Sequence, residues 1–218
     1  MKRGVALLAA WPLAACGGLP ALTPAAPPAQ AELAARCDTL FPDTPWVATH
    51  VLEATLPGNQ QGSFLAVVAA EAPGKFRSIL VSVEGLALYD ASFSYGRTVV
   101  TRAVPPFDRP GFAQNMSADI QLLLFEPREP LREVGVTSQG FGACRWQRAD
   151  GKTVEATLEG PERTRLRLYA KEGSQVEREA LLRGPLQRGL ATDMTLVAPG
   201  TMGYSLHLEL VDGGPVLD

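Results

Sequence analysis

Apolar and polar residues alternate along most segments from residue 45 to the end of the chain. One face of the first segment carries Trp46, Ala48, His50, Leu52 and Ala54. A period of two is typical of a β-strand with one buried face. Similar short segments recur, separated by tight turns such as Asp150-Gly151, a strong hairpin signal. The pattern predicts a mainly β fold, an antiparallel meander of about eleven strands that closes as a barrel or a strongly curved half-barrel.

Two segments have helical spacing instead. Residues 29–40 predict a short N-terminal helix, and residues 115–125 predict a second helix after the Pro-rich loop 105–112. In the second helix Asn115 or Ser117 is the expected cap, and Asp119 falls in the first turn, where the helix dipole favours a carboxylate. The apolar face of this helix carries Met116, Ile120, Leu123 and Leu124. Such a stripe is typical of a helix that fills an open sheet, or of a movable lid over an apolar cavity.

The first residues have the features of a secretory signal peptide. Lys2 and Arg3 precede a short apolar run that ends in small residues. The run is shorter than the ~20 residues that a membrane span needs. Leu13-Ala14-Ala15-Cys16 resembles the bacterial lipobox, which implies cleavage before Cys16, a diacylglycerol on its thiol and acylation of the new amine.

This resemblance predicts how the chain is divided. Residues 1–15 are expected to form the signal peptide, 16–30 the lipidated cysteine with a flexible tether, and 31–218 one β domain. Gly17 follows the cysteine where the enteric sorting rule places Asp for retention in the inner membrane. The resemblance to that rule implies an outer-membrane lipoprotein that faces the periplasm.

Composition bears on two questions, whether the protein binds nucleic acid and whether its cysteines form a disulfide. The 218 residues carry a formal net charge of −3, without a basic run or an aromatic-basic patch, so we expect no nucleic acid. With Cys16 lipidated, Cys37 and Cys144 remain. An even number of thiols in an oxidising compartment permits one disulfide, and two separate buried thiols is the alternative.

Catalytic and metal-binding patterns are missing from the sequence. It contains no G-x-S-x-G elbow, and its two histidines, His50 and His207, fall in the middle of predicted strands. No Cys/His spacing suits zinc. We therefore expect packed or surface histidines, no metal or cofactor, and no enzyme activity. Arg163, Arg165 and Arg167 share one face of a strand, which is typical of a solvated outer face or of contact with phosphate or anionic lipid heads.

The order of these parts resembles the LolA/LolB family of lipoprotein carriers. The matching pieces are residues 116–122 after Pro105-Pro106, and the closing Gly203-Tyr204-Ser205-Leu206. The sequence also looks like a group of LolB-like lipoproteins encoded near aryl polyene genes. The resemblance implies an open antiparallel half-barrel whose apolar concave face, covered by helices, holds acyl chains. It also implies an acyl-lipid or lipoprotein cargo and a periplasmic carrier as partner.

Combining pattern and resemblance, we expect an apolar ligand site under the second helix. Its expected walls and lid comprise Trp46, Leu52, Phe64, Val68, Phe93, Phe107, Phe112, Met116, Ile120, Leu123 and Leu124. The protein would bind an acylated molecule there and hold it or pass it to the membrane without catalysis. Two alternatives are a scaffolding lipoprotein with a solid interior, and an accessory lipoprotein for assembly of an aryl polyene-type lipid.

Overall fold

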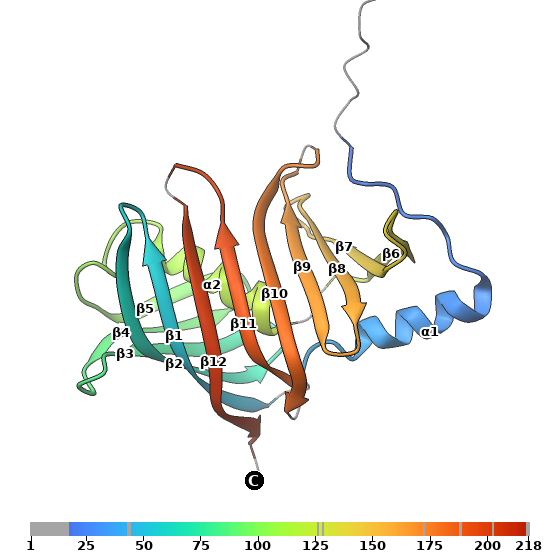
Figure 1. Cartoon of the computed structure of the whole chain (residues 1–218). Coiled ribbons are helices and arrows are strands. Elements are labelled where there is room, and N and C mark those ends of the chain that lie inside the picture. Colours follow the sequence, from blue (N-terminus) through green and yellow to red (C-terminus); the bar gives the residue numbers. More distant parts are fainter. Residues whose placement is uncertain are drawn as a thin grey trace, which may run out of the picture.

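A computed structural model of the chain describes residues 18–42, 45–125, 127, 129–171, 173–187, 189–201 and 203–216. The predicted signal peptide and lipobox lie outside these residues. Within them, two helices and twelve strands follow one another (Figure 1). The helices are α1 (Pro27–Asp38) and α2 (Phe112–Leu124). The strands are β1 (Trp46–Leu56), β2 (Gln60–Ala72), β3 (Lys75–Val81), β4 (Ala87–Ser94), β5 (Arg97–Ala103), β6 (Leu131–Val136), β7 (Gly142–Gln147), β8 (Thr153–Gly160), β9 (Arg163–Tyr169), β10 (Val176–Gln187), β11 (Leu190–Ala198) and β12 (Tyr204–Pro215).

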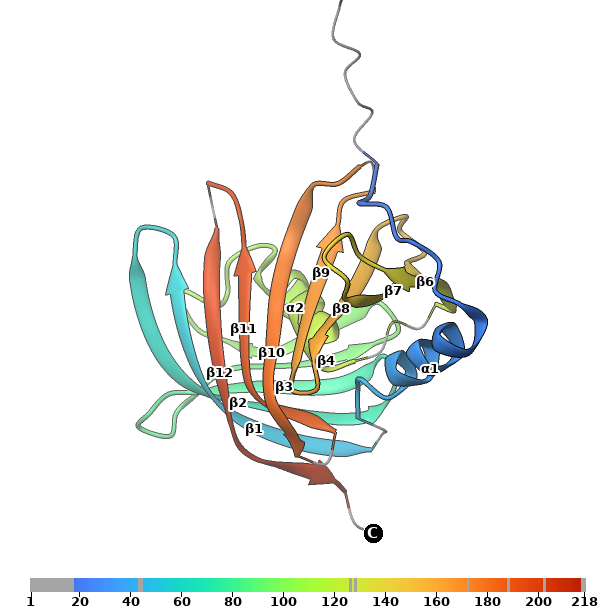
Figure 2. The same cartoon turned by 45° about the vertical axis from the view of Figure 1, so that its right-hand side comes forward.

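All twelve strands form one sheet in the order β5-β4-β3-β2-β1-β12-β11-β10-β9-β8-β7-β6. The first and last strands meet in the middle of the sheet, where an antiparallel ladder joins β1 to β12. The edges are β5 and β6, so the sheet stays open, and it curls around α2 on its concave side (Figure 2). The predicted open antiparallel half-barrel is confirmed, with twelve strands in place of about eleven.

Burial alternates along β1 as its sequence predicts. Trp46, Ala48, His50, Leu52 and Ala54 are buried, whereas Val47 and Glu53 between them are exposed. Burial of apolar area on one face stabilises such a sheet by about 25 cal/mol per Å². The inward faces of both halves of the sheet join α2 in one hydrophobic core.

The chain before α1 lies along the edge strand β6. Backbone N–H and C=O groups of Thr23 and Val136 exchange two hydrogen bonds, both of 2.8 Å. The Arg145 guanidinium donates a further hydrogen bond to the carbonyl of Pro20. A bridge of this kind covers part of an edge that another chain would otherwise pair with. Part of the segment that we expected to be a tether is therefore packed against the β domain.

Helix α1 contacts β6 and β7. It begins at Pro27, within the predicted tether, because Pro fits the first turn of a helix. Leu33 packs so closely on Gly142 that a side chain there would overlap it. A disulfide joins Cys37 to Cys144, with their Cα atoms 6.4 Å apart. Of the two alternatives left open by the sequence, the structure therefore contains the disulfide.

Helix α2 begins earlier than its sequence pattern predicts. Gly111 has a φ of +82°, a conformation that glycine adopts readily, and the helix starts at the next residue. The expected caps, Asn115 and Ser117, consequently lie inside the helix. Among the described residues, neither helix is both long and apolar enough to span a membrane.

Candidate functional site

The eleven residues predicted to form the cavity and lid meet on the concave side of the sheet. All belong to, or pack against, a single hydrophobic core. The buried members are Trp46, Leu52, Val68, Phe93, Phe107, Ile120, Leu123 and Leu124. Phe64, Phe112 and Met116 are half-buried against this core. Their side chains fill the interior, so a ligand that binds there must displace some of them.

Aromatic side chains pack against both ends of α2. Where the helix ends, Phe125 contacts Trp46 with ring centroids 5.3 Å apart. Where it begins, Phe112 contacts Tyr89 at 5.2 Å and Phe107 at 5.3 Å, in edge-to-face arrangements. Each such pair contributes roughly 0.5–1.5 kcal/mol beyond area burial. The helix is thus bracketed by aromatic contacts with β1, β4 and the loop before it.

A buried polar contact fastens the middle of α2 to the far half of the sheet. Arg178 of β10 donates to Asp119 through Nε, at 2.9 Å, and Tyr204 of β12 donates its hydroxyl to the same carboxylate. The guanidinium carbon of Arg178 also lies 5.4 Å from the centroid of the Tyr204 ring. Only 7% of the Asp119 side chain and 18% of the Arg178 side chain are exposed. We call Asp119, Arg178 and Tyr204 the latch.

The latch corrects the role that the sequence suggested for Asp119. Because α2 begins at Phe112, Asp119 lies in the middle of the helix, not in its first turn. Burial raises the pKa of Asp119, and the hydrogen bonds from Tyr204 and Arg178 oppose that shift only in part. Arg178 and Tyr204 were missed because they lie 59 and 85 residues away. The sequence does contain one sign of this contact: Arg178 is a charged residue at an inward position of strand β10.

A groove of about 370 Å³ runs along one side of α2, facing β5 and the β7–β8 turn. Thr98 Oγ1 and Ser117 Oγ, both in its wall, lie 3.2 Å apart and link β5 to α2. Other polar groups of the wall come from Gln121, Arg148 and Asp150. Its apolar lining includes core residues, among them Phe93, Leu122, Phe125 and Val154. The volume lies within the ~300–1,000 Å³ of small-ligand pockets, and the groove adjoins the interior.

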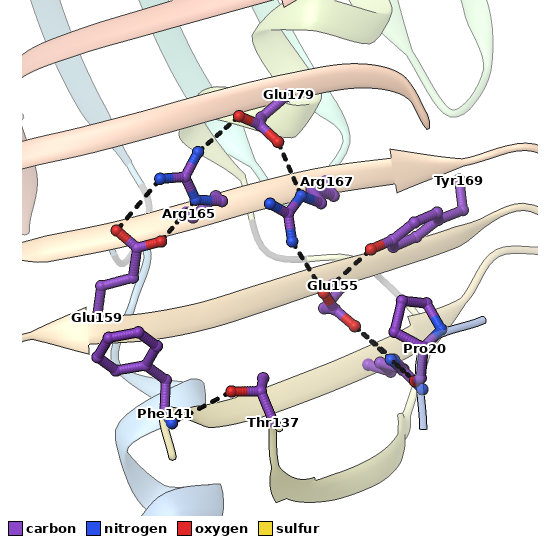
Figure 3. Close-up of polar contacts among 10 residues, drawn as sticks. Pro20, Thr137, Phe141, Glu155, Glu159, Arg165, Arg167, Tyr169 and Glu179 are labelled. Carbon is purple, nitrogen blue, oxygen red and sulfur yellow. Dashed lines mark hydrogen bonds and ion pairs between the residues drawn. The ribbon is translucent and has the colours of Figure 1, made fainter. Parts of the chain in front are cut away.

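Arg165 and Arg167 of β9 lie on the convex side and pair with carboxylates of neighbouring strands (Figure 3). Arg165 bonds Glu159 and Glu179, both at 2.6 Å, and Arg167 bonds Glu179 at 2.8 Å. Arg163 bonds Glu159 at 2.7 Å. The hydrogen bond from Arg165 holds the pKa of Glu159 below its usual value. The three guanidinium groups thus form a cross-strand ladder on an outer face, with carboxylates in the place of the phosphate contacts we considered.

The ladder continues beneath the N-terminal segment. Arg145, only 3% exposed, donates to Glu155 at 2.7 Å as well as to the Pro20 carbonyl. The Tyr169 hydroxyl donates to Glu155 at 3.2 Å (Figure 3). These buried polar groups of the convex side are therefore satisfied by one another and by the segment that covers them.

The two histidines differ in their surroundings. His50 is fully buried on the concave side, and burial lowers its pKa to about 4. His207 lies on the opposite face, where a 2.7 Å hydrogen bond to Asp193 raises its pKa. Within the described part of the chain, ligand atoms of Asp193, His207 and Glu209 lie within 4.8 Å of one another, as in a metal site. Asp193 also pairs with Arg183 at 3.0 Å, so these contacts describe an ion-pair network.

Comparison with solved structures places this open half-barrel, with a helix on its concave side, among known folds. A LolA superfamily protein from Nitrosomonas europaea is similar over 87% of this chain and 94% of its own, with 8% identity and a TM-score of 0.56. A domain from Vibrio parahaemolyticus assigned to outer membrane lipoprotein sorting is similar over 85% of this chain and 92% of its own, with 12% identity and a TM-score of 0.53.

At these identities the likeness establishes the fold alone. No model of a known protein family matches the sequence, and no curated protein matches it. The chain therefore has a LolA-like fold, and its function must be argued from its own residues.

Proposed function

We propose that the protein is an outer-membrane lipoprotein that binds an acylated ligand, a lipid or a lipidated protein, beneath α2. It holds this ligand at the periplasmic face or passes it to the membrane without a chemical conversion. The observation that carries the proposal is the position of α2. It covers the apolar concave face through side-chain contacts, and polar contacts that include the buried latch and the Thr98–Ser117 pair hold its middle.

Magnitudes support displacement of the helix by an acyl chain. Burial of an acyl chain gains about 0.8 kcal/mol per methylene, so about twelve methylenes gain roughly 10 kcal/mol before ordering costs. Removal of one partner of a buried ion pair costs about 3–5 kcal/mol, and opening of α2 returns both Asp119 and Arg178 to water, so separating this pair costs no more than that. A long acyl chain can therefore offset the loss of the latch and of several aromatic contacts.

Two further observations support a role at the membrane, and a third concerns how a ligand enters. The lipobox-like sequence ending in Cys16 provides a covalent anchor in this proposal. The fold is shared with a LolA superfamily protein and with a lipoprotein-sorting domain. The groove of about 370 Å³ beside α2 offers a starting point for an acyl chain that enters the interior.

The test fastens α2 in place and asks whether binding stops. Thr98→Cys with Ser117→Cys places two thiols where hydroxyl oxygens lie 3.2 Å apart, so a disulfide would tie α2 to β5. The full chain is placed in phosphatidylcholine vesicles that contain a diazirine-bearing 1-monolauroylglycerol, irradiated, and analysed by mass spectrometry. The matched control is the single substitution Ser117→Cys.

We expect one probe molecule per wild-type chain, attached within residues 112–124 or the inward face of the sheet. The control should be labelled equally, and the locked variant should lose most of the label. Equal labelling of the locked variant would contradict binding beneath α2. A wild-type chain that takes up no probe there would favour the scaffolding lipoprotein with a solid interior.

A further inference from the structure

Two strands of the sheet each direct one hydrogen-bond donor at the carboxylate of Asp119. Its Oδ1 accepts from Nε of Arg178 at 2.9 Å, and its Oδ2 accepts from the hydroxyl of Tyr204. Arg178 lies on β10 and Tyr204 on β12, and β11 separates the two strands. A single carboxylate therefore contacts both donors at once. Because the donors belong to the sheet and the carboxylate to α2, the closed helix fills a carboxylate site that the sheet provides.

The side-chain acceptors of Arg178 come from α2. Its Nη2 donates to Oδ1 of Asn115 at 3.4 Å, and Asn115, like Asp119, is a residue of this helix. Its Nη1 donates to the backbone carbonyl of Glu177, on its own strand, at 2.8 Å. A ligand that displaces α2 removes both side-chain acceptors, whereas the guanidinium keeps its charge because arginine does not lose its proton in proteins. In the ligand-bound protein Arg178 therefore needs a new anionic partner.

The location of this contact suits the head of an acyl ligand. The Arg178 side chain is 18% exposed and that of Asp119 is 7% exposed, so the contact lies at the border of the interior. The next two inward residues of β10, Ala180 and Leu182, belong to the hydrophobic core, and α2 contacts this strand. A ligand whose head binds Arg178 can therefore extend its acyl chain along β10 beneath the helix.

Charge balance favours an anionic head. When α2 opens, the Asp119 carboxylate returns to water while the ligand carboxylate leaves it, so the two hydration costs largely cancel. An uncharged acyl ligand would leave the guanidinium beside an apolar chain without a counterion, which is unfavourable. A carboxylate also reproduces the two coplanar oxygens of Asp119, each of which accepts from one donor. A phosphate monoester carries up to two negative charges, and Arg178 offers one positive charge to balance them.

We propose that Arg178 and Tyr204 bind the carboxylate of a long-chain carboxylic acid, in the position that the Asp119 carboxylate occupies when α2 is closed. This inference rests on the proposed function and gives it a ligand class, acyl ligands with a free carboxylate. Asp119 is then an internal competitor of the ligand, and release of the helix and capture of the ligand are one exchange at the same two donors.

The experiment measures the preference for a carboxylate separately from binding. The full chain in phosphatidylcholine vesicles at about pH 8.5, where carboxylic acids are ionised, is labelled with the uncharged, diazirine-bearing 1-monolauroylglycerol. Unlabelled laurate, 1-monolauroylglycerol and dodecyl phosphate, which have chains of equal length, compete at equal mole fractions in the vesicles. For the wild type we expect laurate to compete at least tenfold better than 1-monolauroylglycerol, a ratio that corresponds to about 1.4 kcal/mol. Laurate should also compete better than dodecyl phosphate.

Two substitutions remove different halves of the latch and should move this ratio in opposite directions. Arg178→Met removes the cation, so the ratio of laurate to 1-monolauroylglycerol should fall towards one. Asp119→Asn keeps the cation and removes its internal competitor, so the ratio should rise at least about threefold above that of the wild type. Circular dichroism checks that each variant is folded. If Arg178→Met unfolds, Arg178→Met with Asp119→Leu, which leaves no charge in the latch, takes its place and should also give a ratio close to one.

Three further variants separate the contributions of charge and of the second donor. Arg178→Lys keeps the charge without the planar guanidinium and should retain part of the preference. Tyr204→Phe removes the second donor and should lower the ratio by less than Arg178→Met does. The matched control is Arg183→Met, which removes an arginine of the same strand that pairs with Asp193 on the outer face, and it should keep the ratio of the wild type.

Four results would count against the inference. A wild-type ratio close to one, with the probe bound, overturns it while the proposed function stands. An equal fall of the ratio in Arg178→Met and Asp119→Asn assigns the latch a purely structural role. Dodecyl phosphate that competes better than laurate overturns the choice of a carboxylate and assigns the site to a phosphate. A wild-type chain that takes up no probe removes the proposed function itself, and the inference with it.

Discussion

Removal of one partner of the latch should release α2 and leave the sheet intact. In Arg178→Met the Asp119 carboxylate, 7% exposed, keeps only the Tyr204 hydroxyl as a partner. Stranding a buried charge costs about 3–5 kcal/mol, and the partial exposure of Arg178 argues for the lower end, about 3 kcal/mol. Because the latch joins α2 to β10 and β12, most of this loss should appear as local opening of the helix.

Hydrogen–deuterium exchange of the full chain measures this opening directly. At about 1.4 kcal/mol per factor of ten, the amides of residues 112–124 should exchange about a hundredfold faster in Arg178→Met than in the wild type. Amides of β1 and β12, in the middle of the sheet, exchange only on wider unfolding, so in Arg178→Met they should remain slower than those of α2 even where their own rates rise.

The control makes the same chemical change on the same strand. Arg183→Met removes an arginine of β10 that is 46% exposed and pairs with Asp193 on the outer face. An exposed pair contributes about 0–1 kcal/mol, so exchange of α2 should change little. The double variant Arg178→Met with Asp119→Leu leaves no charge in the interior and should restore much of the protection. Less than a threefold change in Arg178→Met, or a double variant that opens as readily, would refute the reasoning.

Three further predictions concern other parts of the molecule. Between pH 6.5 and about 4, His50 is protonated in the unfolded state but remains neutral in the folded state, so the free energy of unfolding should fall by up to about 3 kcal/mol as the pH drops through this window. Thermal unfolding at a series of pH values measures this fall, which should be smaller in His50→Leu. The double substitution Cys37→Ala with Cys144→Ala removes the disulfide that joins residues 107 positions apart. It should lower the free energy of unfolding by at most about 4–5 kcal/mol, measured by denaturant titration. Ile120→Glu should abolish probe labelling while circular dichroism of the sheet is unchanged, because a charge would enter the core.

Local patterns in the sequence were enough to predict the sheet and to place the lid helix approximately. The alternation from Trp46 to Leu56 gives the inward face of β1 because the side-chain period of a strand is two, and the structure buries the predicted side. The sequence pattern places the start of α2 three residues late, because Gly111 ends the preceding turn through its positive φ and periodicity does not register that conformation.

Such local patterns do not predict the polar contacts of the site. Asp119, Arg178 and Tyr204 come from three elements, and periodicity reports which face a residue occupies but not which strand lies opposite. The order of the strands, which brings β10 and β12 to α2, depends on β1 pairing with β12 across almost the whole chain. Arg178 at an inward position was the only local sign that a buried partner was required.

The distribution of unsatisfied and satisfied polar groups argues that the concave side is the functional one. On the convex side Arg145, buried as deeply as a core residue, has a carboxylate and a backbone carbonyl as partners. On the concave side His50 and Tyr89 have none among the described residues, although an apolar residue of similar size would fit a scaffold better. Replacement of such a group by an apolar residue would stabilise the fold. Native sequences therefore keep these locally unfavourable groups chiefly where function requires them. A scaffold with a solid interior gains nothing from these unpaired groups, whereas a protein that admits a ligand beneath α2 can offer them partners.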